Sequence, residues 1–190
     1  MSEIEKYPLF ADEFALADQL ALADLHCGKE PWARAATEWI RGTEVLDAIE
    51  RFQTSVWIFR DVEDFIIGFG ALEATSWKKW PPPDGKKSRL LYLRHLGIGA
   101  KYRGFPPERE YRYSNRILEH LIAQAKKMAI TIRDSKPPSK HVELLTLMVH
   151  RDNLPAQKLY QRYGFELLDG FERDDHFAMS HRLDLDSDSN

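Results

Sequence analysis

The second half of the chain alternates between strand-like and helix-like apolar patterns, and this alternation limits the possible folds more than any other feature. The stretch 90–98 has a strand pattern, and the pattern after it repeats apolar residues at helical spacing from Ile117 to Ala129. A second apolar strand pattern, 141–149, is followed by a short helix pattern and then by further strands up to Leu183. This order predicts an α/β fold in which helices cover a central sheet.

The first half predicts helices followed by a hairpin. Asp12 is a suitable N-cap for a first helix that ends at Gly28, and Gly42 interrupts the second helix pattern. The stretch 55–74 reads as strand, carboxylate-rich turn and strand, which predicts an antiparallel hairpin. The proline-rich stretch 77–87 predicts an exposed loop.

Composition argues against several classes of partner and site. The formal net charge is −3, so no chain-wide basic field is available for a nucleic-acid backbone, and we expect no nucleic-acid partner. Cys27 is the single cysteine, and the seven histidines show no metal-ligand spacing, so we expect neither an intramolecular disulfide nor a metal site. No apolar run approaches the ~18 residues of a membrane span, and Met1–Tyr7 is polar and acidic, which predicts a cytoplasmic protein without membrane contact.

Two helix starts hold the candidate functional residues. The loop before Ser114, the expected N-cap of the long helix, contains several arginines. A helix N-terminus offers unpaired amides and about half a positive charge, which suits a pyrophosphate, although a solvated basic loop has the same composition. Asn153 is interpreted first as the N-cap of the short helix, and Tyr160 first as a core residue four positions after Ala156.

Three stretches of the second half resemble the GNAT acyltransferases. They are 96–104, the helix 114–128, and the more specific run 153–165, which reads Asn-Leu-Pro-Ala-Gln-Lys-Leu-Tyr-Gln-Arg-Tyr-Gly-Phe. The resemblance implies a GNAT fold, with a mixed central sheet flanked by helices on both faces. It also implies a single domain over 1–190, with 1–80 on the acceptor side, 90–183 on the acetyl-CoA side and 184–190 as a frayed tail.

The resemblance further implies acetyl-CoA as cosubstrate and assigns residues to it. The backbone of Leu96, Gly97 and Ile98 would pair with the pantetheine arm, which Asn153 would also approach. The phosphates would lie against the loop residues Arg103, Gly104, Arg109, Arg112, Tyr113 and Ser114. The family loop is short and glycine-rich, whereas here Arg112 and Ser114 replace small residues and Phe105–Arg109 looks like an insertion.

The implied reaction is N-acetylation of a small-molecule or peptide amine by direct attack on the thioester, with Tyr160 as the acid that protonates the departing thiolate. The base is not identified by the sequence. Its candidates on the flanking strands are Glu73, Tyr92, His95 and His150. Two alternatives remain open: a non-catalytic acyl-CoA-binding sensor, and an interaction module that docks through 77–87. Members of the family are often homodimers, and the sequence leaves the oligomeric state open.

Overall fold

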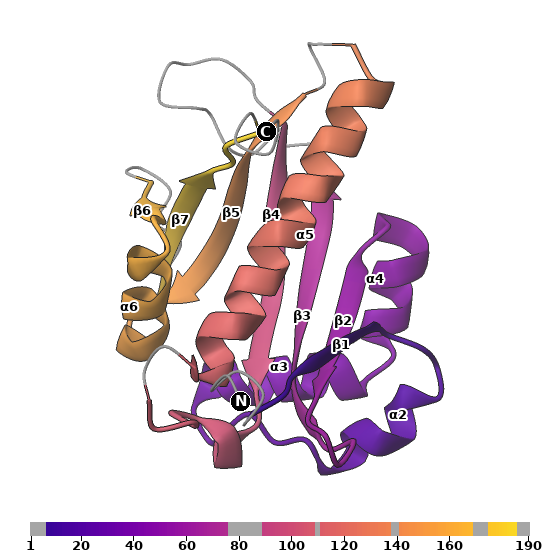
Figure 1. Cartoon of the computed structure of the whole chain (residues 1–190), viewed down its shortest axis with the longest axis vertical. Helices are drawn as coiled ribbons and strands as arrows, with labels where there is room; N and C mark the ends of the chain where they lie inside the picture. Colours follow the sequence, from indigo (N-terminus) through magenta and orange to yellow (C-terminus); the bar gives the residue numbers. More distant parts are fainter. Residues whose placement is uncertain (1–6, 76–88, 109–110, 138–140, 169–174, 186–190) are drawn as a thin grey trace. The chain divides into compact units, whose positions relative to one another are not determined.

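The computed structural model describes residues 7–75, 89–108, 111–137, 141–168 and 175–185 (Figure 1). The strands are β1 (Phe10–Glu13), β2 (Ser55–Arg60), β3 (Ile66–Thr75), β4 (Arg89–Ile98), β5 (Val142–His150), β6 (Glu166–Leu167) and β7 (His176–Arg182). The helices are α2 (Asp18–Ala21), α3 (Pro31–Arg41), α4 (Glu44–Phe52), α5 (Tyr113–Ser135) and α6 (Leu154–Arg162), with 3₁₀ turns at Leu22–Asp24 and Ala100–Tyr102.

The described strands form a seven-stranded mixed sheet in the order β1-β2-β3-β4-β5-β7-β6. β4 and β5 run parallel, joined through the long helix α5, whereas β1–β2, β2–β3, β5–β7 and β6–β7 are antiparallel. The predicted α/β class is therefore confirmed.

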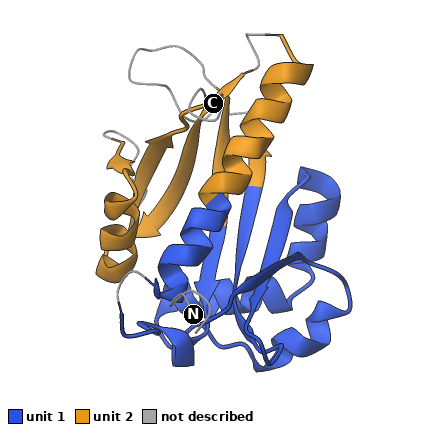
Figure 2. Cartoon of the chain, in the orientation of Figure 1, with its two compact units in different colours: residues 1–72, 95–121 blue, residues 73–94, 122–190 orange. Residues whose placement is uncertain are grey.

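The chain divides into two compact units, coloured separately in Figure 2. Unit 1 comprises Met1–Leu72 and His95–Leu121, and unit 2 comprises Glu73–Arg94 and Ile122–Asn190. β3, β4 and α5 each pass from one unit into the other. The expectation of a single domain over 1–190, with its acceptor and acetyl-CoA sides, stays a prediction.

In unit 1, consecutive residues of β3 face helices on opposite sides. The Phe69 ring stacks on Trp39 of α3, with ring centroids 6.1 Å apart. A Cβ added at Gly68 or Gly70 would instead meet Ile117 or Leu121 of α5. Because side chains alternate across a strand, α3 and α5 lie on opposite faces of β3, as predicted for helices flanking a sheet.

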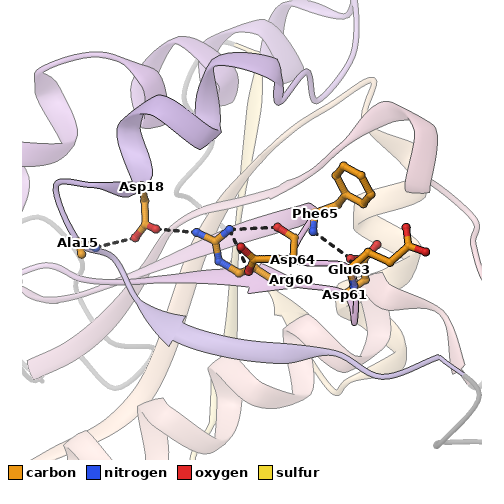
Figure 3. A network of polar contacts seen from close by, with 7 residues as sticks. All are labelled: Ala15, Asp18, Arg60, Asp61, Glu63, Asp64 and Phe65. Carbon is orange, nitrogen blue, oxygen red and sulfur yellow. Dashed lines mark hydrogen bonds and ion pairs between the residues drawn. The ribbon is translucent and has the colours of Figure 1, made fainter.

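An arginine network ties α2 to the hairpin between β2 and β3 (Figure 3). The largely buried guanidinium of Arg60 donates to Asp18 Oδ1 at 2.6 Å and to the Asp64 carbonyl at 3.2 Å. Asp61 closes the turn by accepting from the Phe65 and Glu63 amides at 2.9 and 3.0 Å. The carboxylate-rich turn of the hairpin is thus held by its own side chains, as Asx turns are.

Unit 2 has its own core around β5. Leu145, Leu147 and Val149 are buried on this strand, which matches the apolar pattern that predicted a central strand. α6 and the segment after it add Leu159, Tyr160 and Phe165 to the buried residues.

The structure corrects two local predictions in unit 1. The first helix does not begin at Asp12, because 10–13 forms β1 and pairs with β2 from Phe10–Arg60 to Glu13–Trp57, so tertiary pairing overrides local propensity. Ser114 does not precede α5 but lies in its first turn, since the helix starts at Tyr113.

Other local predictions are confirmed. The interruption at Gly42 separates α3 from α4, and the hairpin predicted over 55–74 is β2 and β3. The proline-rich stretch 77–87 lies outside the described residues. Among the described helices, none combines the length and the apolarity that crossing a membrane requires.

Candidate active site

The carboxyl end of β4 leaves the register that this strand shares with β5. The parallel pairing runs from Arg89–Val142 to Leu93–Leu147, whereas β4 continues to Ile98. Leu96, Gly97 and Ile98, the residues expected to contact a pantetheine arm, therefore lie beyond that pairing. In unit 1 a Cβ at Gly97 would collide with the Phe69 ring, so the glycine is also needed for packing.

The segment after β4 folds back through a tight turn. The Gly99 amide donates to the Ile67 carbonyl at 2.9 Å, and the Phe105 amide donates to the Tyr102 carbonyl at 3.1 Å. Between them Gly104 has φ of 74°, and no atom of the described residues lies within 4 Å of an added Cβ. This position needs glycine for its backbone conformation rather than for space, and its open side suits the approach of a ligand.

Arg103, predicted to contact phosphate, is placed against a carboxylate. Its Nη1 lies 3.2 Å from Glu30 Oε2, and the two side chains are 43% and 42% exposed. The pKa of Glu30 is lowered by its own backbone hydrogen bond and then by Arg103. Exposed pairs of this kind contribute about 0–1 kcal/mol, so an incoming anion could displace Glu30 at little energetic cost.

Arg112 directly precedes α5 and holds an unsatisfied donor. Its Nε is buried and makes no hydrogen bond within the described part of the chain. A buried donor without an acceptor costs about 1–3 kcal/mol, more if charged, which an anion at this position would relieve. The predicted neighbour Arg109 lies outside the described residues.

Three of the first four amides of α5 donate to backbone carbonyls, and that of Arg116 reaches the Arg112 carbonyl at 3.2 Å. The Tyr113 amide donates to the Phe105 carbonyl at 3.0 Å, and the Asn115 amide donates to the Arg112 carbonyl at 2.9 Å. Tyr113 is buried, and burial followed by Asp61 raises the pKa of its phenol. Arg112, Tyr113 and Ser114 thus meet at one helix start, where the positive end of the helix dipole favours an anion.

In unit 2, Asn153 caps α6. Its Oδ1 accepts from the Ala156 amide at 3.3 Å, and its carbonyl accepts from the Gln157 amide at 3.1 Å. Pro155 occupies the first turn, where a missing amide proton costs nothing. The capping role expected from the sequence is confirmed, and the contact of Asn153 with a cosubstrate stays a prediction.

Tyr160 is placed on the buried face of α6. It is 8% exposed, and its ring lies 5.6 Å from that of Phe165. Burial and then Tyr92 raise the pKa of Tyr160 above that of an ordinary phenol. The hydroxyl therefore keeps its proton at neutral pH, as a proton donor must.

The four candidate bases have different surroundings. Glu73 pairs with Arg94 at 2.7 Å, and Nδ1 of His150 accepts from the Asp152 amide at 3.1 Å. The His95 ring stacks on that of Trp39, with ring centroids 4.3 Å apart. Side chains alternate along β4, so His95 and Gly97 lie on the same face as Leu91 and Leu93. This alternation could have placed His95 on that face from the sequence alone.

Comparisons with known proteins identify the fold. No family model and no curated protein matches this sequence. Solved structures match along nearly the whole chain. One is an acetyltransferase of the GNAT family from Staphylococcus aureus Mu50, with a TM-score of 0.61 and 11% identity, covering 93% of this chain and 100% of that one.

Two further structures carry named ligands. The PaiA N-acetyltransferase from Thermoplasma acidophilum, in complex with coenzyme A, has a TM-score of 0.61 at 16% identity and covers 92% of this chain and 99% of its own. AtaT complexed with acetyl-methionyl-tRNAfMet has a TM-score of 0.65 at 15% identity and covers 92% of this chain and 95% of its own. The chain therefore has the GNAT acetyltransferase fold.

The exclusion of nucleic acid from composition was wrong. A protein of this fold is seen with a tRNA, so the fold is compatible with a nucleic-acid partner. The net charge of −3 sums over the whole surface, whereas a bound strand meets only the local charges of one face. Net charge alone therefore cannot decide the partner.

Proposed function

We propose that this chain, which has the GNAT acetyltransferase fold, transfers an acetyl group from acetyl-CoA to an amine. The observation that carries the proposal is the buried Nε of Arg112, which has no acceptor within the described residues although it stands at the start of α5. An anionic cosubstrate would supply that acceptor. The nearby turn at Gly104, where an added Cβ would meet none of the described residues, supports the same interpretation.

The residues of unit 1 would bind the cosubstrate. Arg112, Arg103 and the positive end of the α5 dipole would hold the phosphates of acetyl-CoA, in place of the glycine-rich backbone common in the family. The backbone of Leu96, Gly97 and Ile98 would pair with the pantetheine arm, and an amide near Ile98 would polarise the thioester carbonyl. Tyr113, Ser114, Arg109 and Asn153 complete the proposed set.

Tyr160 would act as the acid. The amine nitrogen attacks the carbonyl carbon, a C–N bond forms and the C–S bond breaks, and the Tyr160 hydroxyl donates its proton to the departing thiolate. A phenol that is buried, with a raised pKa, is protonated at the start of every turnover. We propose an amine of a small molecule or peptide as acceptor, and the aminoacyl group of a tRNA is included in the test because AtaT is seen with such a molecule.

The first test is thermal unfolding with and without acetyl-CoA. A ligand at a hundred times its Kd adds about 2.7 kcal/mol, which raises the Tm of a chain of this size by about 5–10 °C. Equal concentrations of inorganic pyrophosphate serve as the control for non-specific anion binding. Absence of a shift at millimolar acetyl-CoA would contradict the proposal.

The second test is thiol release with spermidine, a methionyl peptide and methionyl-tRNA as acceptors. Release that depends on one acceptor identifies an enzyme. Binding without any release, with Tyr160→Phe indistinguishable from the wild type, would favour the sensor alternative instead.

A further inference from the structure

Within unit 2, a side chain of β7 contacts the residue that closes α6. Gly164 follows the helix with φ of 75°, a conformation that often ends a helix. Its carbonyl oxygen lies 3.3 Å from Nδ1 of His181. A carbonyl oxygen only accepts, so Nδ1 carries the proton in this hydrogen bond. His181 thus holds the turn after α6 from a position 17 residues further along the chain.

The His181 ring also packs on the residue that follows this turn. Its centroid lies 5.2 Å from that of Phe165, with the two planes at 31°. Phe165 is only 2% exposed, and its ring lies 5.6 Å from the ring of Tyr160. Ring contacts therefore lead without a gap from His181 on β7 to the proposed acid on α6.

The backbone ties the same turn to Tyr160. The Tyr160 carbonyl accepts from the Tyr163 amide at 2.9 Å and from the Phe165 amide at 3.1 Å. Beyond the turn, β6 pairs with β7 up to the position next to His181, in the pair Glu166–Ser180 (Figure 1). A displacement of the turn would therefore move Phe165, and with it the surface against which the Tyr160 ring packs.

We propose that His181 is a positioning residue for Tyr160, an inference that rests on the proposed function. His181 exchanges no proton with the substrate. Its hydrogen bond to Gly164 and its contact with Phe165 hold the Tyr160 ring in the orientation from which the phenol protonates the departing thiolate. Proton transfer and group transfer depend steeply on such geometry, and a misplacement of about 1 Å can lower a rate about 100-fold.

The test measures thiol release by His181→Ala, with the most active acceptor among spermidine, a methionyl peptide and methionyl-tRNA. At a temperature where the variant is folded, kcat should fall about 10-fold, a part of the roughly 100-fold that a general acid contributes. The Kd of acetyl-CoA, measured by calorimetry, should change less than about twofold. His181→Asn should recover most of the lost kcat, because its amide nitrogen can donate to the Gly164 carbonyl.

His141→Ala is the matched control. Nε2 of His141 also lies within hydrogen-bond distance of a backbone carbonyl, that of Lys136 at 3.1 Å, but this contact precedes β5 and involves neither α6 nor Phe165. The control variant loses the same kind of hydrogen bond in the same unit. Its kcat should equal that of the wild type.

A double substitution separates positioning from a general structural role. In a Tyr160→Phe background there is no phenolic proton left to place, so His181→Ala should cause no further fall in kcat. A histidine that only stabilises the end of α6 would instead change kcat by the same factor in both backgrounds, or would lower the Tm and leave kcat unchanged.

Each outcome decides the proposal. A wild type inactive on every acceptor overturns the proposed function, and this inference with it. An active wild type that folded His181→Ala equals in kcat overturns this inference alone, as do equal losses in the two backgrounds or a His181→Asn variant no faster than His181→Ala. If His181→Ala does not fold, His181→Phe, which keeps a ring against Phe165 but has no donor, takes its place in the same comparison.

Discussion

The starts of α5 and α6 differ in how far the chain satisfies their polar groups. At α6 the Asn153 side chain accepts from Ala156 and Pro155 removes one amide, so the chain itself satisfies much of this helix end. At α5 the Arg112 Nε remains buried without an acceptor among the described residues. A helix start that its own residues complete is structural, whereas one that leaves a cationic donor unsatisfied is suited to a ligand.

The two regions also differ in what their tyrosines can do. Tyr160 is buried on α6, where burial and then Tyr92 raise the pKa of its phenol. Tyr113, at the start of α5, packs against Tyr102 and Phe105 with ring centroids 6.0 and 5.7 Å away. In the proposed function, the α6 region would supply the proton donor and the α5 region the anion site.

The largest effect is expected from Tyr160→Phe. Removal of the proton donor should lower kcat about 100-fold, while the Kd of acetyl-CoA should change less than about twofold because the ring against Phe165 is retained. Because the raised pKa keeps the phenol protonated, no loss of wild-type activity between pH 7 and 9 should come from Tyr160. Steady-state kinetics measures kcat, and calorimetry measures the Kd of acetyl-CoA. An unchanged kcat would mean that Tyr160 has only a structural role in α6.

Arg112→Met should weaken acetyl-CoA binding about 10- to 100-fold, since a hydrogen bond to a charged group contributes about 1.5–3 kcal/mol. The Tm without ligand should stay level or rise, because the variant removes a buried unsatisfied donor. Arg51→Met, at an exposed position on α4, is the matched control and should bind normally. A lower Tm with unchanged affinity would mean that Arg112 is structural.

Asn153→Ala should cost about 1 kcal/mol of folding free energy through the lost cap, which lowers the Tm by about 2–4 °C. Asn153→Asp keeps an accepting oxygen and should restore that stability. If Asn153 also contacts the cosubstrate, the Asp variant should still show a smaller Tm rise with acetyl-CoA. Equal ligand responses in Asn153→Asp and the wild type would restrict Asn153 to capping.

The smallest expected effect is a difference in stability between alanine variants of two glycines, one from each region. Gly104 and Gly164 have φ of 74° and 75°, so alanine should cost about 1 kcal/mol at either position. A Cβ at Gly164 would also lie 3.3 Å from His181, whereas one at Gly104 would meet no atom in the part of the chain that the structure describes. Denaturant unfolding should therefore find Gly164→Ala the less stable variant, and the reverse order would show that the Gly104 turn is more constrained than its surroundings suggest.

Much of the fold could be predicted from local patterns. The hairpin at β2 and β3, the break at Gly42 and the cap at Asn153 depend on contacts within a few residues, and all three predictions were right. The predicted helix at Asp12 failed because β2 offers 10–13 a partner 44 or more residues away along the chain, in the pairs Phe10–Arg60 to Glu13–Trp57. Local propensity carries no information about such a partner.

The sequence by itself determined the order of strands and helices in the second half of the chain, the α6 motif and the positions of the arginines, because periodicity and capping are local properties. The tertiary structure decided which polar groups are satisfied. It paired Arg103 with Glu30, left Arg112 Nε without an acceptor among the described residues, and stacked His95 on Trp39. These outcomes depend on distances between residues remote in sequence, and such distances exist only once the chain has folded.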